Sequence, residues 1–304
     1  MLVADNKSTA VIVGAGASKP YGFPLGRELR DLVLKIRTTD STLKLLKQFG
    51  VSQDAFRDFH TDLQMAAIST VDAFLEKRPS WMRVGKIAMA LGLDGIENEG
   101  KLFPPNHPKD HWYESLWQSL SCTSWAKLKS SKVRIVSFNY DRTLECYFCG
   151  VIENNFKISR AKAAEWLTKE FITHPHGTLG KYRGERLNWL SDRRDQYTRI
   201  KKALDGIVVI SEANPKTASY AKARKLLEVS QNYVFLGFGY HSQNMERLGF
   251  PNICKKQNRD IYASHKGVPK SEWWNICKYD FSADNLFGQN WPSLSRIVSL
   301  PIFR

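Results

Sequence analysis

The sequence predicts an α/β fold, an open doubly wound parallel sheet with a helical insertion between its first two strands. Short runs rich in Val, Ile and aromatic residues are continuously apolar, as in strands buried on both faces of a parallel sheet. Amphipathic helical patterns follow most of these runs, and this alternation is typical of a doubly wound sheet. Between the first two runs, a long stretch has helical patterns only.

The expected strands are residues 9–14 (TAVIVG), 132–139 (KVRIVSFN), 206–210 (GIVVI), 233–239 (YVFLGFG) and 259–264 (RDIYAS). A further short strand is expected directly before the segment HPHG. Residues 23–37 place Leu29, Val33 and other apolar side chains on one helical face, with Pro24 at a favourable helix start. Residues 215–231 show a second clear helical pattern, just before a strand.

The helical insertion runs from Ser41 to Leu128. Its segments TLKLLKQFG, DAFRDFHTDLQMAAI, VDAFLEKRP, WMRVGKIAMALGL and WYESLWQSL all have a helical pattern, and residues 99–110 read as a turn-rich surface loop. The sequence has no internal repeat and no Gly/Ser linker. We therefore predict a single domain over residues 1–304, with 41–128 as a helical subdomain.

Composition excludes a disordered chain. The 304 residues are 42% hydrophobic and 25% charged, as in folded globular proteins. No stretch approaches 18 uncharged apolar residues, so we expect a soluble, cytoplasmic protein with no membrane partner. The five cysteines are odd in number and have no framework spacing, which predicts reduced thiols rather than disulfides.

The chain is strongly basic, with a net charge of +15. Such a charge can attract nucleic acid or another polyanion. The most basic stretch, residues 180–202, has eight basic and three acidic side chains. We favour a solvated surface for this stretch, because the sequence has no recognisable nucleic-acid motif; a nucleic-acid partner bound through the basic surface stays open.

The first predicted strand ends in GAGAS, residues 14–18. These small residues let the backbone turn sharply and let a pyrophosphate approach main-chain N–H groups. The dinucleotide fingerprint GxGxxG is incomplete, because Lys19 and Pro20 stand where a third glycine and a regular helix start are needed. No second strand with a terminal acidic residue follows about 20 residues on. A nucleotide site is predicted, and a dehydrogenase is disfavoured.

Three further segments lie where a doubly wound sheet places its ligand crevice, at the carboxyl ends of strands. They are SFNYDRTLE, ITHPHGTLG and FLGFGYHSQNMERL. The side chains and glycines that they bring to this edge are Ser137, Asn139, Asp141, His174, His176, Gly177, Gly237 and Gly239. Because the carboxyl ends of parallel strands share one edge, we expect these residues to converge.

In their order along the chain, these motifs resemble the sirtuin-like NAD-consuming domains, and more closely the prokaryotic relatives that hydrolyse NAD. The matching segments are GAGAS with GFPLGREL, TVDAFLE, SFNYD, the HG of HPHG and GFGYHSQNMERL, from Val11 to Leu248. The resemblance implies a modified Rossmann-like sheet, with NAD lying over the carboxyl ends of the strands.

The resemblance also implies roles for individual residues. Asn139 would orient the nicotinamide ribose and the attacking water, His176 would be the general base, and Asp141 would support the catalytic site. The residues implied to bind NAD are Gly14, Ala15, Gly16, Ser18, Pro24, Arg27, Ser137, Gly237 and Gly239. Other roles stay open: a turn histidine bonded to the backbone for His176, a helix cap for Asp141, and structural or supporting roles for His174 and His241.

Asparagine and histidine suit NAD hydrolysis on chemical grounds. Nicotinamide departs as a neutral molecule, so it needs little protonation, while positive charge develops on the ribose. The site has to fix the ribose, hold hydroxyls or water with an amide, and supply a base that works near neutral pH.

A zinc site is not expected. Sirtuin deacylases carry two Cys-x-x-Cys pairs around zinc, whereas this chain has one such pair, Cys146 and Cys149. Leu25 also stands where deacylases tend to have an acidic residue. NAD hydrolysis is therefore favoured over protein deacylation, with NAD as substrate and no further cofactor.

Prokaryotic relatives commonly act in antiviral defence, so the resemblance implies a triggered enzyme that depletes NAD. Control would come from self-assembly into a homo-oligomer or from another polypeptide, such as a HerA-type ATPase. Two rival functions stay open. One is a subunit that binds NAD or ADP-ribose without cleaving it, and the other is a nucleic-acid-associated subunit, suggested by the +15 charge.

Overall fold

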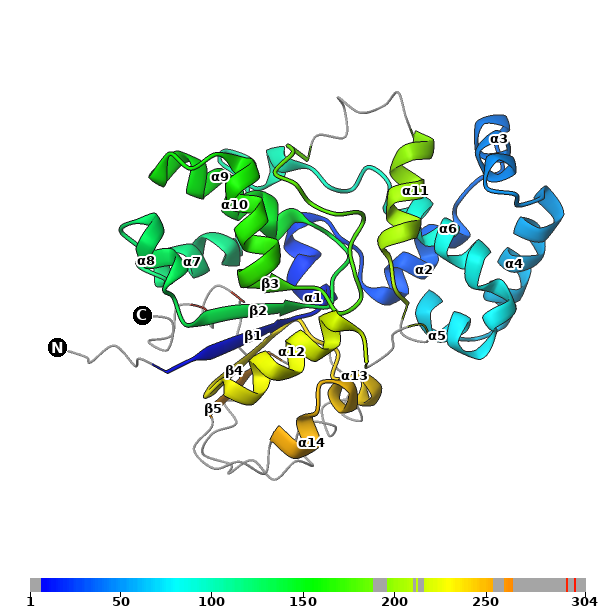
Figure 1. The fold of residues 1–304 in the computed structure, drawn as a ribbon. Helices are drawn as coiled ribbons and strands as arrows, with labels where there is room; N and C mark the ends of the chain where they lie inside the picture. The colour runs from blue at the N-terminus through cyan, green and yellow to red at the C-terminus, as the bar shows by residue number, and fades with distance from the viewer. Residues whose placement is uncertain are drawn as a thin grey trace.

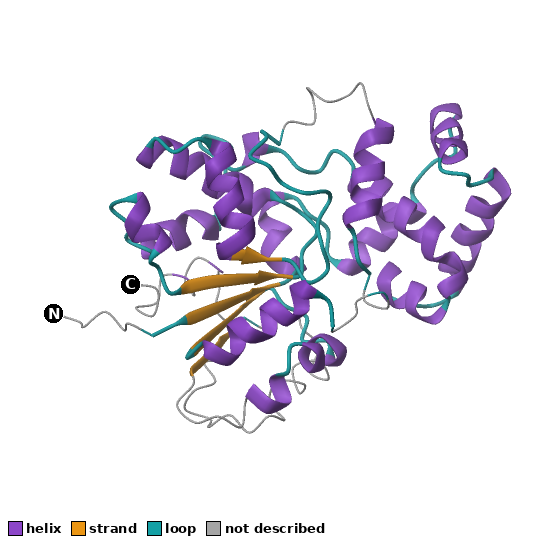
Figure 2. Ribbon diagram, in the orientation of Figure 1, coloured by secondary structure: helices purple, strands orange, loops and turns teal. Residues whose placement is uncertain are grey.

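The structure is a computed structural model that describes residues 7–187, 196–209, 212, 216–253, 260–264, 294 and 298. Its centre is a five-stranded parallel sheet in the order β3-β2-β1-β4-β5 (Figures 1 and 2). The strands are β1 (Thr9–Val13), β2 (Val133–Ser137), β3 (Ile172–Thr173), β4 (Asn232–Leu236) and β5 (Asp260–Ala263). The predicted α/β class is confirmed.

The segment between β1 and β2 contains helices and loops but no strand, as predicted. Its helices are α1 (Ala15–Ser18), α2 (Gly26–Leu34), α3 (Asp40–Gln48), α4 (Gln53–Met65), α5 (Val71–Lys77), α6 (Met82–Leu93), α7 (Trp112–Ser119) and α8 (Trp125–Lys129). Short 3₁₀ turns lie among them at η1 (Lys19–Tyr21), η2 (Pro79–Trp81) and η3 (Glu99–Lys101). The loop expected at 99–110 is confirmed apart from η3.

The remaining helices follow β2. They are α9 (Thr143–Phe156), α10 (Arg160–Trp166), a π-helical turn η4 (Leu167–Phe171), α11 (Gln196–Gly206), α12 (Ala218–Val229), α13 (Ser242–Arg247) and α14 (Phe250–Ile253). No helix in the described part of the chain is long and apolar enough to span a bilayer.

Alternating side chains of the sheet explain why helices cover both of its faces. Val11 and Val13 of β1 pack into a core that includes residues of α7–α10. Ala10 and Ile12 point the other way, into a core that includes residues of α12–α14. Figure 1 shows the two helical layers on opposite sides of the sheet. Strands buried on both faces have to be apolar throughout, which is the pattern that the sequence shows.

The insertion does not pack as one unit. Helices α2–α6 form a separate hydrophobic core together with residues of α11, and we call this group the helical lobe. Helices α7 and α8 instead pack on the sheet. Figure 2 shows the strand arrows pointing toward the helical lobe, so the lobe stands at the carboxyl edge of the sheet.

The strand expected at residues 206–210 is wrong. Gly206 ends α11, and Ile207 makes only an isolated antiparallel bridge to Gly177. Ile207 and Val209 are fully buried in the core of the helical lobe, so this short apolar run is a buried connection. Periodicity alone cannot separate such a connection from a strand. Residue 210 lies outside the described residues.

Two helix starts also differ from the expected ones. Helix α2 begins at Gly26 rather than near Pro24, because the Glu28 carboxylate accepts a hydrogen bond from the Leu25 N–H (2.8 Å) and caps the helix. After β1, a single helical turn, α1, already forms over Ala15–Ser18, and Pro20 falls within η1. A proline is tolerated there, because the first residues of a helical turn need no intrahelical donor.

The basic stretch at 180–202 is a solvated surface where it is described. Lys181, Arg183, Arg186, Lys201 and Lys202 are exposed. Arg199 is partly buried and pairs with Asp94 (2.8 Å). Residues 188–195, including Arg193 and Arg194, lie outside the described part.

The sheet has a topological switch point between β1 and β4. From β1 the chain adds β2 and β3 on one side, and then β4 and β5 on the other. The loops that leave β1 and β4 touch through their backbones: the Gly16 N–H donates to the Gly237 carbonyl (2.9 Å). A Cβ on Gly14 would lie 2.7 Å from the Gly237 carbonyl oxygen, so the contact requires glycine.

This contact yields a stability prediction for Gly237. Gly237→Ala adds a Cβ that overlaps the Ala17 backbone nitrogen, at a left-handed φ of +56°. We expect the free energy of unfolding to fall by about 3 kcal/mol or more. Gly50→Ala is the matched control, because Gly50 has a φ of +71° with nothing near the added Cβ. It should lose only the conformational cost of about 1–2 kcal/mol. Equal losses in urea denaturation would show that the two loops do not depend on this contact.

Candidate functional site

A cavity of about 390 Å³ lies at the switch point, over the carboxyl ends of β1, β2 and β4. This volume is within the range of small-molecule sites. Every predicted site residue except Ser137 lines it: Gly14, Ala15, Gly16, Ser18, Pro24, Arg27, Asn139, Asp141, His176, Gly237 and Gly239. Ser137 is buried at the end of β2, where its hydroxyl oxygen accepts a hydrogen bond from the Asn139 N–H (3.3 Å).

The glycines of the first loop bring two backbones into close contact. The N–H groups of Gly14, Gly16 and Ala17 donate to the carbonyls of Leu236, Gly237 and Gly14, at 2.9–3.0 Å. These three donors are therefore already used within the protein. The loop needs glycine so that two backbones can meet, and Gly14 has an ordinary extended φ of −122°.

The orientation of the Asn139 amide follows from its hydrogen bonds. The Ser18 hydroxyl donates to the Asp141 carboxylate (2.6 Å), so the Ser18 oxygen is left to accept. It accepts from the Asn139 side-chain nitrogen Nδ2 (2.7 Å). Asn139 Oδ1 is then the free end of the amide, and it is buried without a hydrogen-bond partner among the described residues. An unpaired buried oxygen in a pocket wall is a ready acceptor for a ligand hydroxyl or a water.

Asp141 is fully engaged by its neighbours. Oδ2 accepts from Ser18, while Oδ1 accepts from the N–H and the hydroxyl of Thr143, the first residue of α9. Burial raises the pKa of the Asp141 carboxyl, and these hydrogen bonds oppose that rise. Oδ1 therefore binds the first residue of α9 from just before the N-cap residue Arg142, while Oδ2 binds the first loop. Asp141 acts as a positioning residue for Ser18 and Asn139.

His176 is neutral at physiological pH. Burial lowers the pKa of its ring to about 4, with the Arg247 cation adding to the effect and the Asn244 side chain opposing it. Nε2 is hydrogen-bonded to the Tyr220 hydroxyl (2.8 Å), and the Phe138 ring packs against the imidazole edge-on. The ring is therefore held by a side chain, not by the backbone as in a simple turn histidine. The imidazole is thus in contact with two polar side chains, Tyr220 and Asn244.

A buried pair of His174 and Glu145 holds the backbone of Asn139. His174 Nδ1 donates to the Asn139 carbonyl (3.0 Å), and Nε2 lies 2.7 Å from the Glu145 carboxylate, which is 1% exposed. Burial on its own would lower the pKa of His174, but Glu145 and the Asn139 carbonyl raise it above its ordinary value. His174 does not line the cavity, which fits the supporting role left open for it. His241 does line the cavity, and its side chain is exposed.

The helical lobe supplies the outer wall of the cavity. Thr70 and Asp72 come from the segment TVDAFLE, to which the sequence assigned no site residue, and Asp72 accepts a hydrogen bond from the Tyr140 hydroxyl (3.1 Å). Arg27 is exposed at the wall and pairs with no acidic side chain in the described part of the chain. It is a cation available to a phosphate.

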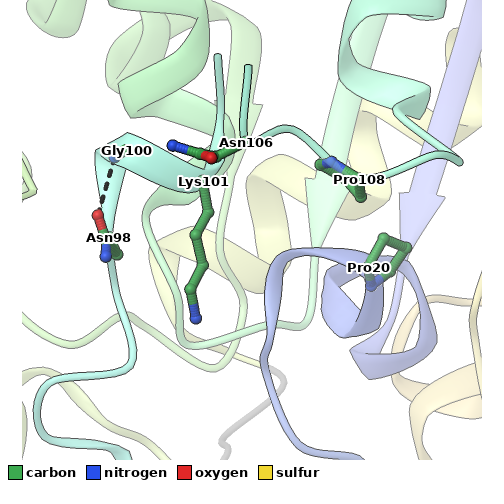
Figure 3. A pocket seen from close by; sticks show the side chains of 6 residues that line it. All are labelled: Pro20, Asn98, Gly100, Lys101, Asn106 and Pro108. Carbon is green, nitrogen blue, oxygen red and sulfur yellow. Dashed lines mark hydrogen bonds between the residues drawn. The ribbon is translucent and has the colours of Figure 1, made fainter. Parts of the chain in front are cut away.

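The pair Cys146 and Cys149 is buried within α9. Burial raises the pKa of both thiols to about 12, which keeps them protonated and poor metal ligands. Cys254 and Cys277 lie outside the described residues. A second cavity of about 430 Å³, lined by Pro20, Asn98, Gly100, Lys101, Asn106 and Pro108, contains none of the predicted site residues (Figure 3).

No protein-family model matches the chain, and no curated protein matches its sequence. The function is therefore inferred from the geometry of the switch-point cavity, and the sirtuin-like resemblance stays a prediction.

The buried pair gives a prediction for Glu145. Glu145→Gln removes the carboxylate that raises the pKa of His174, and we expect a loss of about 1.5–3 kcal/mol of stability below pH 6.5. Because the folded pKa of His174 is raised, the pair stabilises fully below pH 6.5, and its contribution fades as pH rises through that folded pKa. Thermal midpoints measured across this range should show the fading in the wild type only. Glu165→Gln is the control, since Glu165 pairs with Lys169 on the exposed surface. If Glu145→Gln and Glu165→Gln lose equally little stability, the buried pair stabilises the fold no more than an exposed pair does.

Proposed function

We propose that the protein is an NAD hydrolase that cleaves the bond between nicotinamide and ribose to give nicotinamide and ADP-ribose. The observation that carries this proposal is the fixed amide of Asn139, whose free Oδ1 shares a cavity wall with the neutral His176. An acceptor and a base at the switch point of a parallel sheet are suited to a nucleotide ribose.

Asn139 holds the reacting ribose or the water in this proposal. Its amide cannot rotate without breaking the hydrogen bond to Ser18, so Oδ1 keeps one direction. The His174–Glu145 pair fixes the Asn139 main chain in the same way. Such preorganisation lowers the entropy cost of bringing water and substrate together.

His176 takes the proton in this proposal. As the glycosidic bond breaks, its electron pair moves to the pyridinium nitrogen, so nicotinamide leaves neutral and the cation develops on the ribose. Water then adds at the ribose carbon, and its proton passes to the imidazole of His176, which the Tyr220 hydroxyl holds at Nε2. A histidine that is charged at pH 7 could not accept this proton, whereas His176 is neutral there.

Arg27 binds the pyrophosphate in this proposal. Its exposed guanidinium lines the same cavity as Asn139, and guanidinium groups pair with phosphate through two hydrogen bonds. Because the N–H groups of Gly14 and Gly16 are already used, a side-chain cation is the better candidate for the phosphate charge. A triggered role in antiviral defence, with homo-oligomers or a HerA-type ATPase as partner, is supported by the resemblance of the motifs.

The proposal predicts that His176→Ala and Asn139→Ala each slow the release of nicotinamide from NAD by about 100-fold or more. Chromatography of the reaction mixture measures nicotinamide and ADP-ribose together. His60→Gln is the control, because His60 lies on α4 in the helical lobe, outside the cavity. A wild-type rate in a folded His176→Ala variant would refute the assignment, and binding of NAD without nicotinamide release by the wild type would favour a non-catalytic NAD-binding subunit.

The pH dependence of the same reaction separates a base from a structural histidine. The base must be neutral, so the rate should stay level down to about pH 5 and fall about tenfold per unit below the His176 pKa of about 4. A fall that begins near pH 6.5, in protein whose circular dichroism is unchanged, would contradict a buried neutral base.

A further inference from the structure

A second cluster of chemically active side chains lies outside the cavity, at the start of α7. His107 comes from the turn-rich loop expected at residues 99–110, His111 is the residue directly before α7, and Glu114 comes from the first turn of α7. One potential ligand atom from each of the three residues lies within 4.8 Å of the others. From this convergence we propose that His107, His111 and Glu114 form a binding site for a divalent transition metal of the zinc type.

The Nδ1 atoms of both imidazoles are hydrogen-bonded within the protein. His107 Nδ1 lies 3.1 Å from the Pro108 carbonyl, which can only accept, so Nδ1 carries the proton and Nε2 carries the lone pair. His111 Nδ1 lies 3.0 Å from the hydroxyl of Tyr21, which is buried. Metal-binding histidines are usually anchored through their second ring nitrogen in this way.

The donor set selects the class of metal. Two imidazoles and one carboxylate are the ligands of His₂Glu zinc sites, in which water takes the fourth position. Magnesium and calcium prefer sites built from oxygen alone. The Leu102 backbone is hydrogen-bonded to the His111 ring, so a metal bound by this ring has to replace that hydrogen bond. The expectation of no zinc rests on cysteine spacing, and this cluster contains no cysteine.

The three ligand atoms, which lie within 4.8 Å of one another, have to move closer together to hold an ion. With zinc–ligand bonds of about 2.0–2.1 Å, tetrahedral ligand atoms lie roughly 3.4 Å apart. His111 is buried, while His107 and Glu114 are partly exposed and can rotate toward it. The imidazoles are already stacked, with ring centroids 5.1 Å apart. The partly exposed side also gives the ion and its water a route in.

The start of α7 is hydrogen-bonded to residues 17–21, the segment that follows the first loop. The Tyr113 N–H donates to the Tyr21 hydroxyl (3.1 Å), and the Trp112 indole N–H donates to the Ala17 carbonyl (2.8 Å). Figure 3 shows Pro20 of this segment across a cavity from Asn106 and Pro108, the residues on either side of His107. A bound metal would therefore stabilise the start of α7 together with η1.

The test uses the full chain without a polyhistidine tag, stripped of metal by a chelator. Titration with zinc, followed by calorimetry and elemental analysis, should give one ion per chain and a raised thermal midpoint, because a ligand that binds only the folded state stabilises it. Cobalt in place of zinc should give the strong visible absorption of a tetrahedral site. His107→Gln and Glu114→Gln should each weaken zinc binding about tenfold or more.

Matched controls keep the outcome clear. His60→Gln and Glu165→Gln change the same residue types elsewhere and should bind zinc as the wild type does. Circular dichroism establishes that His107→Gln and Glu114→Gln are folded. Absence of zinc binding by the folded wild type would overturn the proposal, and so would full zinc binding by both variants.

Discussion

The backbone contact between the loops that leave β1 and β4 is the constraint on which the rest of the site depends. Gly14 and Gly16 lie so close to Gly237 that a side chain on any of the three would collide with the opposite main chain. Three N–H groups of the first loop are used within the protein as a result. The contact fixes where the first loop leaves the sheet, and so it sets the position of Ser18.

The position of Ser18 in turn fixes the side chains of Asp141 and Asn139. Its hydroxyl joins the first loop to the second, by donating to Asp141 and accepting from Asn139. Burying polar groups is costly unless they are hydrogen-bonded. Asp141, Ser18 and the Asn139 nitrogen Nδ2 are hydrogen-bonded to one another in series, whereas Asn139 Oδ1 has no partner among the described residues. His174, which follows β3, pairs with Glu145 of α9 and donates a hydrogen bond to the backbone of the same Asn139. A buried polar network thus ends in one oriented acceptor beside one neutral histidine.

The convergence of the site could be predicted because it depends on topology. Parallel strands share a carboxyl edge, so segments such as SFNYD and HPHG had to meet there. Of the residues expected at this edge, Ser137, His174 and Gly177 do not line the cavity. What the sequence could not supply depends on tertiary contacts. The apolar residues Ile207 and Val209 are buried in the core of the helical lobe and not in the sheet. The contact between Glu145 and His174 joins residues that are far apart in the sequence and depends on the packing of α9. The His107, His111 and Glu114 cluster depends on the path of a loop, which has no periodic signal.

The central claim is that NAD lies in the switch-point cavity with its nicotinamide ribose beside Asn139 and His176. A crystal structure of the His176→Ala variant soaked with NAD tests it most directly, because slow turnover preserves the substrate. The account predicts NAD in this cavity, a ribose hydroxyl within hydrogen-bond distance of Asn139 Oδ1 and the pyrophosphate near Arg27. NAD bound elsewhere, or a cavity that stays empty at saturating NAD, would contradict it.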